Sequence, residues 1–428
     1  MTKNSDRYTS FLILKDIFAS GAYSNISLRS ELNKLDSEQS KSFVTKLVYG
    51  VVERKLYLDY IISKLSSTKL SKIDIDILIV LEMALYQIIY MDKVPESAAV
   101  NEAVKLTKTI NKRLAGFVNA NLRNFLRNKD DLVKVDISDE LERLSVEYSI
   151  SKEFLDILVS DYDNETLLNF LKRSMDERLL NIRINTKKTN KKDLEALLDK
   201  FNIKYEESDI SIDSLIIYDK VSDVIKSLFS QGYISFQDAT SASLQDHIKL
   251  NKGDRILDIC AAPGGKSMHM AEKLLEGSIT SCDIYEHKIK LLEKEAARLG
   301  LDNIEFKLND ALKLNKDFVD VFDKVLIDVP CSGSGIISRK PEIKYQIGTK
   351  ELKELNQKQW KILNNAKNYV KKGGLLVYST CSILKMENEY ILKKFLEENK
   401  DFTLEEYIKH MPTEKINDGF FISYLRKD

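Results

Sequence analysis

Two cysteines in this sequence stand where a thiol could act as a nucleophile. Of the four cysteines in the 428-residue chain, Cys331 and Cys381 each follow an apolar run typical of a buried strand. A free thiol with a pKa of about 8.5 is mostly protonated at neutral pH, so a nucleophilic cysteine needs a nearby cation or a helix N-terminus. We expect Lys266 and the helix N-termini after both loops to supply this help. Cys260 and Cys282 are most simply small buried side chains.

A glycine-containing loop lies between an earlier apolar run and a predicted helix. Two adjacent glycines let a backbone approach a ligand closely, and a helix N-terminus adds N–H donors and a positive end. We therefore expect this loop to bind a cofactor through Cys260, Ala261, Ala262, Pro263, Gly264, Gly265 and Lys266. The alternative is the phosphate-binding loop of a nucleotide hydrolase, with Asp328 holding Mg²⁺. That pattern, G-x-x-x-x-G-K-[ST], needs glycine at position 260, where this chain has cysteine.

Acidic residues end the next three predicted strands. Asp283 follows the second strand, about 20 residues after the loop, where an acid commonly binds the ribose hydroxyls of a cofactor. Asp310 follows the third strand, where it could meet an adenine amine, and Asp328 ends the fourth. A lone Asp after a strand is often a helix N-cap, but three in succession favour a ribose-containing cofactor. The cysteines lack the close paired spacing of zinc ligands, so we expect no metal site.

A thiol, a carboxyl group and such a cofactor together suggest methyl transfer to cytosine. Cytosine C5 is a poor nucleophile, but addition of a thiolate to C6 turns C5 into an enamine-like carbon that accepts an electrophilic methyl group. A base must then remove the C5 proton so that the thiol can leave. Asp328 could bind the ring and orient or protonate it. Two cysteines suit these two halves of the cycle, and their spacing alone does not say which one attacks.

Alternating strands and helices must position these residues. This alternation predicts a mostly parallel seven-stranded sheet covered on both faces, an α/β Rossmann-like fold. The predicted strands are Arg255–Cys260, Ser278–Asp283, Ile304–Leu308, Lys324–Asp328 and Leu375–Ser379, with Thr403–Glu406 and Phe420–Leu425 at a sheet edge. The predicted helices are Lys266–Leu275, Tyr285–Leu299, Lys350–Val370 and Leu384–Glu397.

The first half of the chain has a different pattern. Residues 7–128 read as helices, and Gln39–Leu65 shows the apolar 3–4 spacing of an amphipathic helix. Asn181–Asn185 and Ile203–Tyr205 alternate like strands on either side of a helix at Lys191–Phe201, so residues 178–240 read as α+β.

The charge of the chain is balanced in total but uneven along it. Lys plus Arg and Asp plus Glu both number 66, which argues against binding to nucleic acid by bulk charge. Residues 101–129 hold seven basic residues against one acidic, residues 130–165 hold twelve acidic against three basic, and residues 339–372 hold ten basic against three acidic. The shift near residue 130 predicts a domain boundary. The basic blocks are either RNA-facing surfaces or ordinary solvated helix faces.

The chain shows no export signal and no membrane span at the sequence level. The first eighteen residues lack a signal-type apolar region. The longest apolar stretch, Ile77–Tyr90, contains Glu82 and is shorter than the ~20 residues that a span needs. We therefore expect a cytoplasmic protein with reduced thiols, no membrane partner and, by default, a monomer.

Three motifs, in order, resemble the RNA cytosine-C5 methyltransferases that use S-adenosylmethionine (SAM). They are Asp258-Ile-Cys-Ala-Ala-Pro-Gly-Gly-Lys266, Asp328-Val-Pro-Cys-Ser-Gly-Ser-Gly335 and Ser379-Thr-Cys-Ser382, and Asp418-Gly-Phe-Phe-Ile422 is similar to the closing strand of that family. The resemblance implies that Cys381 attacks cytosine and that Cys331 assists enzyme release. It also implies that residues 260–266 bind SAM and that Asp283, Asp310 and Asp328 contact the cofactor or the cytosine pocket.

The helical half resembles a NusB-like RNA-binding domain. The segments that carry this resemblance are Leu47-Val-Tyr-Gly50, Tyr86-Gln87, Val94-Pro95, Asn101-Glu-Ala-Val104 and Phe117-Val-Asn-Ala-Asn-Leu-Arg123. Fusion to the methyltransferase is the arrangement of bacterial 16S rRNA cytosine-C5 methyltransferases. The resemblance covers nearly the whole chain, except that Tyr148-Ser-Ile-Ser-Lys152 lacks an expected Pro and Trp.

These observations predict three domains and an RNA partner. The domains are a NusB-like helical RNA-binding domain (1–130), a connector with a small α+β RNA-binding subdomain (131–240) and a methyltransferase domain (241–428). We expect the RNA contacts at Lys112, Arg113, Arg123, Arg183, Arg339 and Lys340. The resemblance implies that the partner is 16S rRNA, and we expect this rRNA to be unassembled or partly assembled, since an enzyme must reach an unstacked base. A non-catalytic RNA-binding or antitermination factor is the alternative, against which the intact cysteine pair counts.

Overall fold

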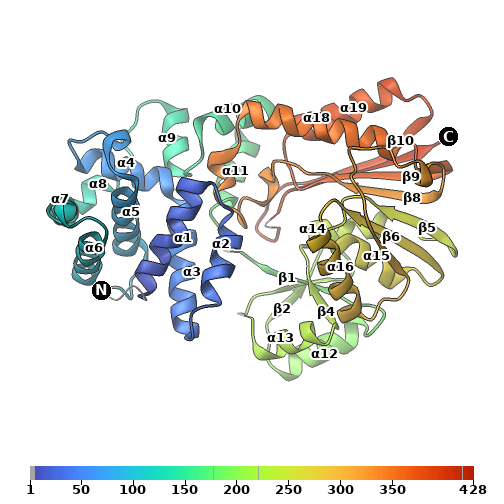
Figure 1. Cartoon of the computed structure of the whole chain (residues 1–428), viewed down its shortest axis with the longest axis horizontal. Helices are drawn as coiled ribbons and strands as arrows, with labels where there is room; N and C mark the ends of the chain where they lie inside the picture. Colours follow the sequence, from blue (N-terminus) through green and yellow to red (C-terminus); the bar gives the residue numbers. More distant parts are fainter. Residues whose placement is uncertain (1–4, 177, 220, 417) are drawn as a thin grey trace. The chain divides into compact units, whose positions relative to one another are not determined.

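The computed structural model describes residues 5–176, 178–219, 221–416 and 418–428 (Figure 1). Within these residues the chain forms two compact units. Unit 1 comprises Met1–Met175 together with Ile337–Ile347, and unit 2 comprises Asp176–Ile336 together with Gly348–Asp428. Residues 131–175 thus group with the helices and residues 178–240 group with the large sheet. The expected boundaries after residues 130 and 240 stay a prediction.

Unit 1 is helical, as the apolar 3–4 spacing predicts. Its helices are α1 (Asp6–Ser20), α2 (Ser24–Leu32), α3 (Glu38–Glu53), α4 (Lys55–Leu65), α5 (Ile75–Tyr90), α6 (Glu96–Ile110), α7 (Ala115–Arg127), α8 (Lys129–Leu132), α9 (Glu140–Glu147), α10 (Lys152–Asp161), α11 (Asn164–Arg173) and α17 (Ile343–Gln346). Short 3₁₀ turns lie at Leu70–Lys72 and Lys112–Leu114. The periodic stretch Gln39–Leu65 is two helices, because the chain turns at Arg54.

Helix α5 is the centre of unit 1. The Asp74 carboxylate caps its first turn by accepting a hydrogen bond from the Asp76 N–H at 3.0 Å, and every side chain from Ile77 to Ile88 is buried. Helix α3 packs closely against it, because Gly50 has no side chain where the Tyr86 ring lies. Two of the five segments that carry the NusB resemblance therefore meet in one helix–helix contact.

The segment Ile337–Ile347 packs within unit 1, although its neighbours in sequence belong to unit 2. The Ser24 N–H and hydroxyl donate to the Glu342 carboxylate at 3.0 and 2.8 Å. The Tyr345 hydroxyl donates to the Val52 carbonyl. Lys344 is fully buried and donates to the Tyr148 carbonyl at 3.3 Å. This excursion is thus part of the interior of the helical unit.

Unit 2 begins with a small antiparallel sheet. Its strands β1 (Leu180–Ile184), β2 (Tyr205–Glu207), β3 (Ser214–Ile217) and β4 (Ile234–Phe236) lie in the order β2-β3-β1-β4. Helix α12 (Lys191–Lys200) follows β1, and helix α13 (Asp223–Ser230) follows β3. The βαββαβ order is that of a ferredoxin-like fold, which RNA-recognition modules share. The sequence pattern indicated two of these four strands.

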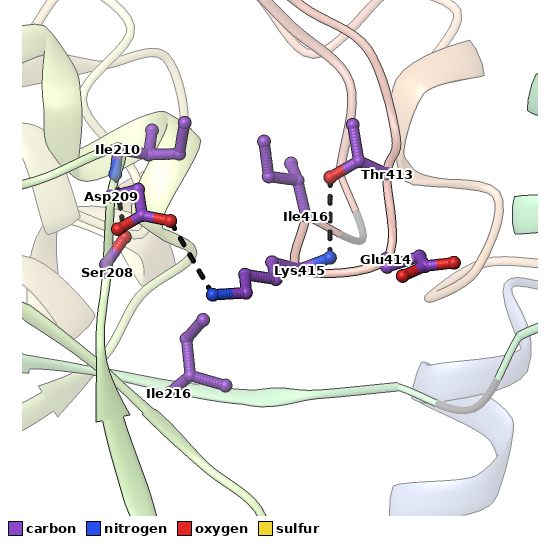
Figure 2. Close-up of a pocket in the computed structure, with 8 residues that line it drawn as sticks. All are labelled: Ser208, Asp209, Ile210, Ile216, Thr413, Glu414, Lys415 and Ile416. Carbon is purple, nitrogen blue, oxygen red and sulfur yellow. Dashed lines mark hydrogen bonds and ion pairs between the residues drawn. The ribbon is translucent and has the colours of Figure 1, made fainter.

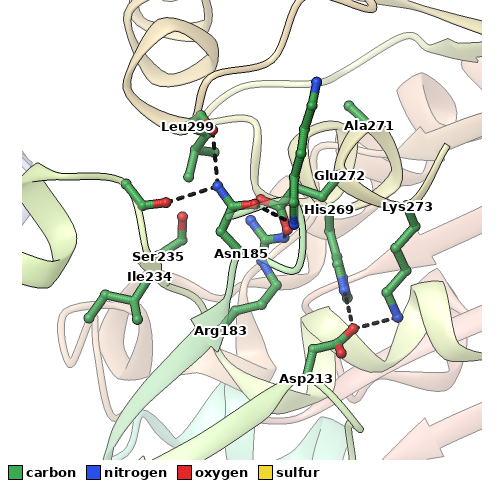
Figure 3. A network of polar contacts seen from close by, with 12 residues as sticks. Arg183, Asn185, Asp213, Ile234, Ser235, His269, Ala271, Glu272, Lys273 and Leu299 are labelled. Atoms are coloured by element: carbon green, nitrogen blue, oxygen red, sulfur yellow. Dashed lines mark hydrogen bonds and ion pairs between the residues drawn. The ribbon is translucent and has the colours of Figure 1, made fainter. Parts of the chain in front are cut away.

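The sheet face opposite α12 and α13 is covered rather than open to RNA. Figure 3 shows Arg183 of β1 beside Glu272 of helix α15 (Gly265–Lys273), and Asp213 between His269 and Lys273 of the same helix. The Arg183 and Glu272 side chains are both fully buried. The expectation that Arg183 contacts RNA is therefore wrong, because an ion pair inside unit 2 holds its guanidinium.

A seven-stranded sheet forms the rest of unit 2. Its strands are β5 (Asp254–Asp258), β6 (Gly277–Asp283), β7 (Ile304–Leu308), β8 (Phe322–Asp328), β9 (Val370–Thr380), β10 (Phe402–His410) and β11 (Phe420–Lys427), in the order β10-β11-β9-β8-β5-β6-β7. Strands β5 to β9 pair in parallel, and β11 pairs antiparallel with β9 and β10. The α/β Rossmann-like fold is confirmed, with the expected antiparallel pair at one edge.

Helices cover both faces of this sheet. Helix α15 and helix α16 (Glu286–Leu299) pack on one apolar cluster, and α18 (Thr349–Ala366) and α19 (Glu389–Glu398) pack on the other. Helix α14 (Ala239–Ala242) precedes β5. The 3₁₀ turns of unit 2 are Ser243–His247, Lys316–Phe318, Ser334–Ile336 and Lys385–Glu387. This layering leaves the carboxyl ends of the parallel strands as the edge where a ligand can bind.

Candidate active site

The two candidate nucleophiles meet at the ends of neighbouring strands. The register of β8 and β9 pairs Asp328 with Ser379, so Cys331 and Cys381 both lie just beyond a shared rung of the sheet. Their sulfur atoms are 3.1 Å apart, within reach of an S–H···S hydrogen bond. Contact with Cys381 and then burial raise the pKa of the Cys331 thiol well above its ordinary value. The two thiols thus form one coupled site.

The expected activation by helix N-termini is wrong for both loops. A three-residue 3₁₀ turn at Ser334–Ile336 follows Cys331, and α19 begins only at Glu389, eight residues after Cys381. The charge of a helix terminus falls off within its first turn, so α19 begins too far along the chain to act as the helix directly after Cys381.

Lys266 and Asp328 form an ion pair beside the cysteine loops. The Lys266 ammonium, from the first turn of α15, donates to Asp328 Oδ2 at 2.6 Å. Asp328 Oδ1 accepts a hydrogen bond from the Ser379 hydroxyl at 3.0 Å. Lys266 also lies 4.8 Å from the centre of the Phe420 ring. The cation that the sequence suggested as a partner for a thiol is instead bonded to the carboxylate that ends β8.

The loop between β5 and α15 is closely packed at both of its glycines. Gly264 has φ +107°, and a side chain there would lie 2.7 Å from Leu292. A side chain at Gly265 would lie 3.1 Å from Gln237. Asp258 ends β5, where it accepts a hydrogen bond from Ser267, and burial raises its pKa to about 7. Its Oδ1 atom is buried and has no hydrogen-bond partner among the described residues.

The acids at the next strand ends also cap turns. Asp283 is buried and accepts hydrogen bonds from the Tyr285 N–H at 3.2 Å and from Lys288 at 3.4 Å. Asp310 accepts from the Leu312 N–H at 3.0 Å and is half-buried. Neither residue is a helix N-cap, since the N-cap of α16 is Tyr285 and no helix begins directly after Asp310. Each carboxylate caps a turn and keeps further lone pairs for a ligand. Cys282 is buried, which raises its pKa to about 12, as expected of a packing residue.

Three residues near these groups were not singled out by sequence. Gln237 lies against Gly265, and its Oε1 atom is buried without a hydrogen-bond partner among the described residues. Asn309 precedes Asp310, and its Nδ2 atom is also buried without a hydrogen-bond partner among the described residues. Glu387 is buried and bonded to the residues that follow both cysteines. No motif rule marks these positions, since each depends on contacts between separate elements.

A pocket of 320 Å³ in unit 2 lies apart from this constellation. It is lined by Ser208, Asp209, Ile210, Ile216, Thr413, Glu414, Lys415 and Ile416, and Figure 2 shows Lys415 reaching toward Asp209. None of the candidate site residues is among its lining residues. In the described part of the chain, no group of three or more His, Cys, Asp or Glu side chains is arranged to hold a metal ion. No helix there has the length and apolar character needed to cross a membrane.

The remaining candidate RNA contacts lie in unit 1. Lys112 and Arg113 are exposed in the turn before α7, and Arg123 is exposed on α7, where it bonds to Asn119. Arg339 and Lys340 are half-buried at the start of the excursion. Lys340 lies 5.2 Å from the centre of the Tyr23 ring. Their role in RNA binding stays a prediction.

Comparison with known proteins identifies the family. A family model described as 16S rRNA methyltransferase RsmB/F matches residues 246–426, and the NusB family model matches residues 4–127. The probable ribosomal RNA small subunit methyltransferase B of Bacillus subtilis is 32% identical to this chain, over the full length of both. The chain belongs to the RsmB/F methyltransferase family.

Other relatives agree with this assignment. The probable ribosomal RNA small subunit methyltransferase B of Synechocystis is 30% identical over 99% of both chains. The crystal structure of PH0851 superposes with a TM-score of 0.81 at 25% identity, covering 98% of both chains. A methyltransferase homologue from Pyrococcus horikoshii superposes with a TM-score of 0.59 at 25% identity, covering 68% of this chain and all of that one. As a member of this family, the chain is a SAM-dependent rRNA methyltransferase.

The residues present fit SAM. Two buried oxygen atoms that lack hydrogen-bond partners among the described residues, Asp258 Oδ1 and Gln237 Oε1, lie at the loop that enters α15. The N-terminal N–H groups of α15 suit a carboxylate, and the remaining lone pairs of Asp283 suit ribose hydroxyls. Membership of the RsmB/F family favours SAM over a nucleoside triphosphate at this loop.

Proposed function

We propose that this enzyme methylates C5 of a cytosine in 16S rRNA, with Cys381 as the nucleophile and Cys331 as the group that assists release. The proposal rests chiefly on the 3.1 Å contact between the two sulfurs at the shared end of β8 and β9. SAM supplies an electrophilic methyl group when bound. The names of the relatives, which refer to small subunit rRNA, support the choice of substrate.

The contact between the thiols favours Cys381 as the attacking group. The raised pKa of Cys331 keeps that residue protonated, so its S–H can donate to the Cys381 sulfur. The Cys381 sulfur accepts this bond, so of the two residues Cys381 is the one placed to attack. Cys381 then adds to C6 of the cytosine, the C5=C6 electron pair becomes available at C5, and C5 takes the methyl group.

The same contact between the sulfurs explains how Cys331 can act in the second half of the catalytic cycle, the release of the methylated cytosine. Once Cys381 is bonded to C6, it carries no charge, so its Coulomb effect, one of the causes that raise the Cys331 pKa, is removed. Cys331 can then lose its proton to solvent and accept the proton from C5. The electrons of the C5–H bond re-form the C5=C6 double bond, the C6–S bond breaks, and Cys381 leaves as a thiolate.

Asp328 and Lys266 orient the base in this proposal. The two bonds that Asp328 accepts, from Lys266 and Ser379, fix the plane of its carboxylate at the end of β8. A carboxylate fixed in this way can accept a hydrogen bond from the exocyclic amine of cytosine. The proposed RNA contacts at Lys112, Arg113, Arg123, Arg339 and Lys340 would hold the surrounding strand. We further propose cytoplasmic action on unassembled or partly assembled rRNA by a monomer.

The test is to map 5-methylcytosine in 16S rRNA incubated with SAM and the wild-type or variant enzyme. We expect the wild type to methylate unassembled 16S rRNA and assembled small subunits much less. We expect Cys381→Ala to give no methylation, because no adduct can form. We expect Cys331→Ala to accumulate an RNA–protein adduct on a denaturing gel, because release lacks its base.

A Cys282→Ala variant is the matched control, since that thiol packs in an apolar cluster and its loss should leave methylation intact. Full activity of Cys381→Ala would overturn the assignment of the nucleophile. Absence of the adduct with an inactive Cys331→Ala would show that Cys331 is only structural. Methylation confined to assembled subunits would overturn the proposed substrate state.

A further inference from the structure

The buried carboxylate of Glu387 joins the two cysteine loops. Glu387 ends a 3₁₀ turn (Lys385–Glu387) between β9 and α19, and it is fully buried. Its Oε1 atom accepts a hydrogen bond from the Ser332 N–H at 2.8 Å, and its Oε2 atom accepts from the Ser332 hydroxyl at 2.6 Å. The Ser382 hydroxyl also donates to Oε2. Because Ser332 follows Cys331 and Ser382 follows Cys381, one carboxylate holds both loops one residue beyond each sulfur.

Helix α18 adds a third anchor to the same carboxylate. The Gln359 amide donates to Glu387 Oε1 at 2.8 Å and to the Pro330 carbonyl at 2.9 Å. Pro330 precedes Cys331, so the loop is held on both sides of its sulfur. Both oxygens of Glu387 therefore accept two hydrogen bonds, and all four come from uncharged donors.

Direct bonds between the loops add to this arrangement. The Ser334 and Ser382 hydroxyl oxygens are 2.9 Å apart. The Gly335 N–H donates to the Cys381 carbonyl at 3.0 Å, a backbone contact that does not depend on any side chain. Within the segment after Cys381, the Asn388 amide donates to the Ser382 carbonyl at 2.8 Å. The two loops therefore pack as one body, with the Glu387 carboxylate at the point where their side chains converge.

A buried carboxylate is costly unless hydrogen bonds replace its hydration. Among the described residues, Glu387 has no ion pair with Lys, Arg or His, so the neutral donors alone compensate for its burial. A satisfied buried network of this kind favours one arrangement of the groups that it joins. The arrangement favoured here is the one that brings the sulfurs of Cys331 and Cys381 into contact.

We propose that Glu387 is a positioning residue that sets the separation of the Cys331 and Cys381 sulfurs and so prepares Cys381 for attack. The inference rests on the proposed function, because it gives the two thiols the roles described above. Glu387 itself acts through Ser332 and Ser382. The other charged groups beside the thiols are Asp328 and its partner Lys266, which the test leaves unchanged.

The test compares the wild type with Glu387→Gln, whose amide presents N–H groups to atoms that already donate. Cys381 is alkylated with iodoacetamide across a range of pH, without RNA or SAM, and the rate at each cysteine is read by mass spectrometry. We expect Cys381 to be alkylated several-fold more slowly than in the wild type near neutral pH, because the Cys331 sulfur is no longer held beside it. We also expect kcat to fall about tenfold or more, with little change in the KM for SAM.

Two further variants keep the proposal testable if Glu387→Gln folds poorly. Ser332→Ala removes one hydroxyl donor and should shift the profile in the same direction by less. Glu387→Asp keeps the charge on a shorter side chain and should give a profile between wild type and Glu387→Gln. The matched control is Glu389→Gln, which lies two residues away and is bonded to Lys409 at 2.7 Å, and its profile should equal the wild type.

Distinct outcomes separate the two proposals. An unchanged Cys381 profile in a folded Glu387→Gln or Ser332→Ala variant would overturn the positioning role, whatever their activity. A shifted profile together with full methylation by Cys381→Ala would leave the positioning role intact and overturn the function proposed for Cys381. Thermal unfolding of each variant shows whether a fall in kcat reflects loss of fold instead.

Discussion

Lys344 is a cation buried inside the helical unit. It has no exposed surface, and its ammonium contacts the Tyr148 carbonyl and the Met175 sulfur. Burial lowers its pKa from 10.5 to about 8. A lysine held in this way destabilises the folded state whenever it is charged, since the unfolded chain hydrates the same charge fully.

We expect Lys344→Met to change how stability depends on pH. In the wild type the unfolded state binds more protons than the folded state between pH 8 and 10.5, so the free energy of unfolding rises with pH in that window. The methionine variant lacks this rise. Its free energy of unfolding should exceed that of the wild type by up to about 3 kcal/mol below pH 8, and this difference should vanish as the pH approaches 10.5.

Denaturant unfolding of both proteins from about pH 6 to about pH 10.5 measures this difference. Lys108→Met, at an exposed position on α6, is the control and should follow the wild type throughout. A constant difference between Lys344→Met and wild type across this range would show that Lys344 does not titrate in the window.

At the level of residues, the candidate catalytic side chains could be predicted from sequence, but the residues that hold them in place could not. Cys331 and Cys381 could be found because each follows a strand in a motif that needs no partner to be recognised. The Lys266–Asp328 pair joins residues from different elements, which a local pattern does not reveal. The prediction that Arg183 contacts RNA was wrong for the same reason. A basic residue in a strand gives the same sequence pattern whether its side chain is exposed to water or buried under helix α15.

At the level of elements, the contact between α3 and α5 depends on one missing side chain. A Cβ at Gly50 would overlap the Tyr86 ring, and both helices are buried at this point. We expect Gly50→Ala to lower the stability of the protein by about 1–3 kcal/mol through overpacking. Thermal or denaturant unfolding gives the measurement.

Gly116→Ala is the matched control for this prediction. Gly116 lies in α7 with no atom within 4 Å of the place where its Cβ would be, so helix propensity should make alanine neutral or stabilising. Adding Tyr86→Ala to Gly50→Ala should relieve the overlap, although it leaves a cavity. Equal stability of Gly50→Ala and Gly116→Ala would show that the helices can separate at no cost.

Helices and strands could be predicted where the apolar periodicity continued over many residues or where predicted strands alternated with predicted helices. The strands of the large sheet and α15, α16 and α18 lie close to their expected positions. Strands β3 and β4 were not expected, because four- and three-residue strands carry little pattern of their own. Helix α19 begins later than expected because a 3₁₀ turn, with Glu387 in the loop network, occupies the intervening residues.

At the level of the whole molecule, zero net charge leaves RNA binding to local surfaces. We expect Lys112→Glu, Arg113→Glu and Arg123→Glu together to weaken binding to 16S rRNA and to reduce the slope of log K against log salt by roughly two. The physical reason is that fewer counterions are released from the RNA when fewer cations contact it. Filter binding at several salt concentrations measures both quantities.

A triple variant with the same change in net charge controls for long-range repulsion. Lys192→Glu, Lys226→Glu and Lys252→Glu change exposed positions in unit 2. We expect this variant to keep the wild-type slope. If both triple variants weaken binding equally, the turn before α7 and the exposed side of α7 have no special role in contacting RNA.

The excursion at Ile337–Ile347 also affects the order in which the protein can be made. Residues are synthesised from the N-terminus, so Met175 emerges long before Lys344 and Tyr345, which fill the interior of the same helical unit. The interior of the helical unit stays incomplete while strands β1 to β8 are translated. The large sheet stays incomplete until β9 and the strands after it are translated. Chains usually fold one domain after another during translation. In this chain the helical unit can be completed only after residues 337–347 have been made, and unit 2 only after β11, so both units reach their final structures late in synthesis.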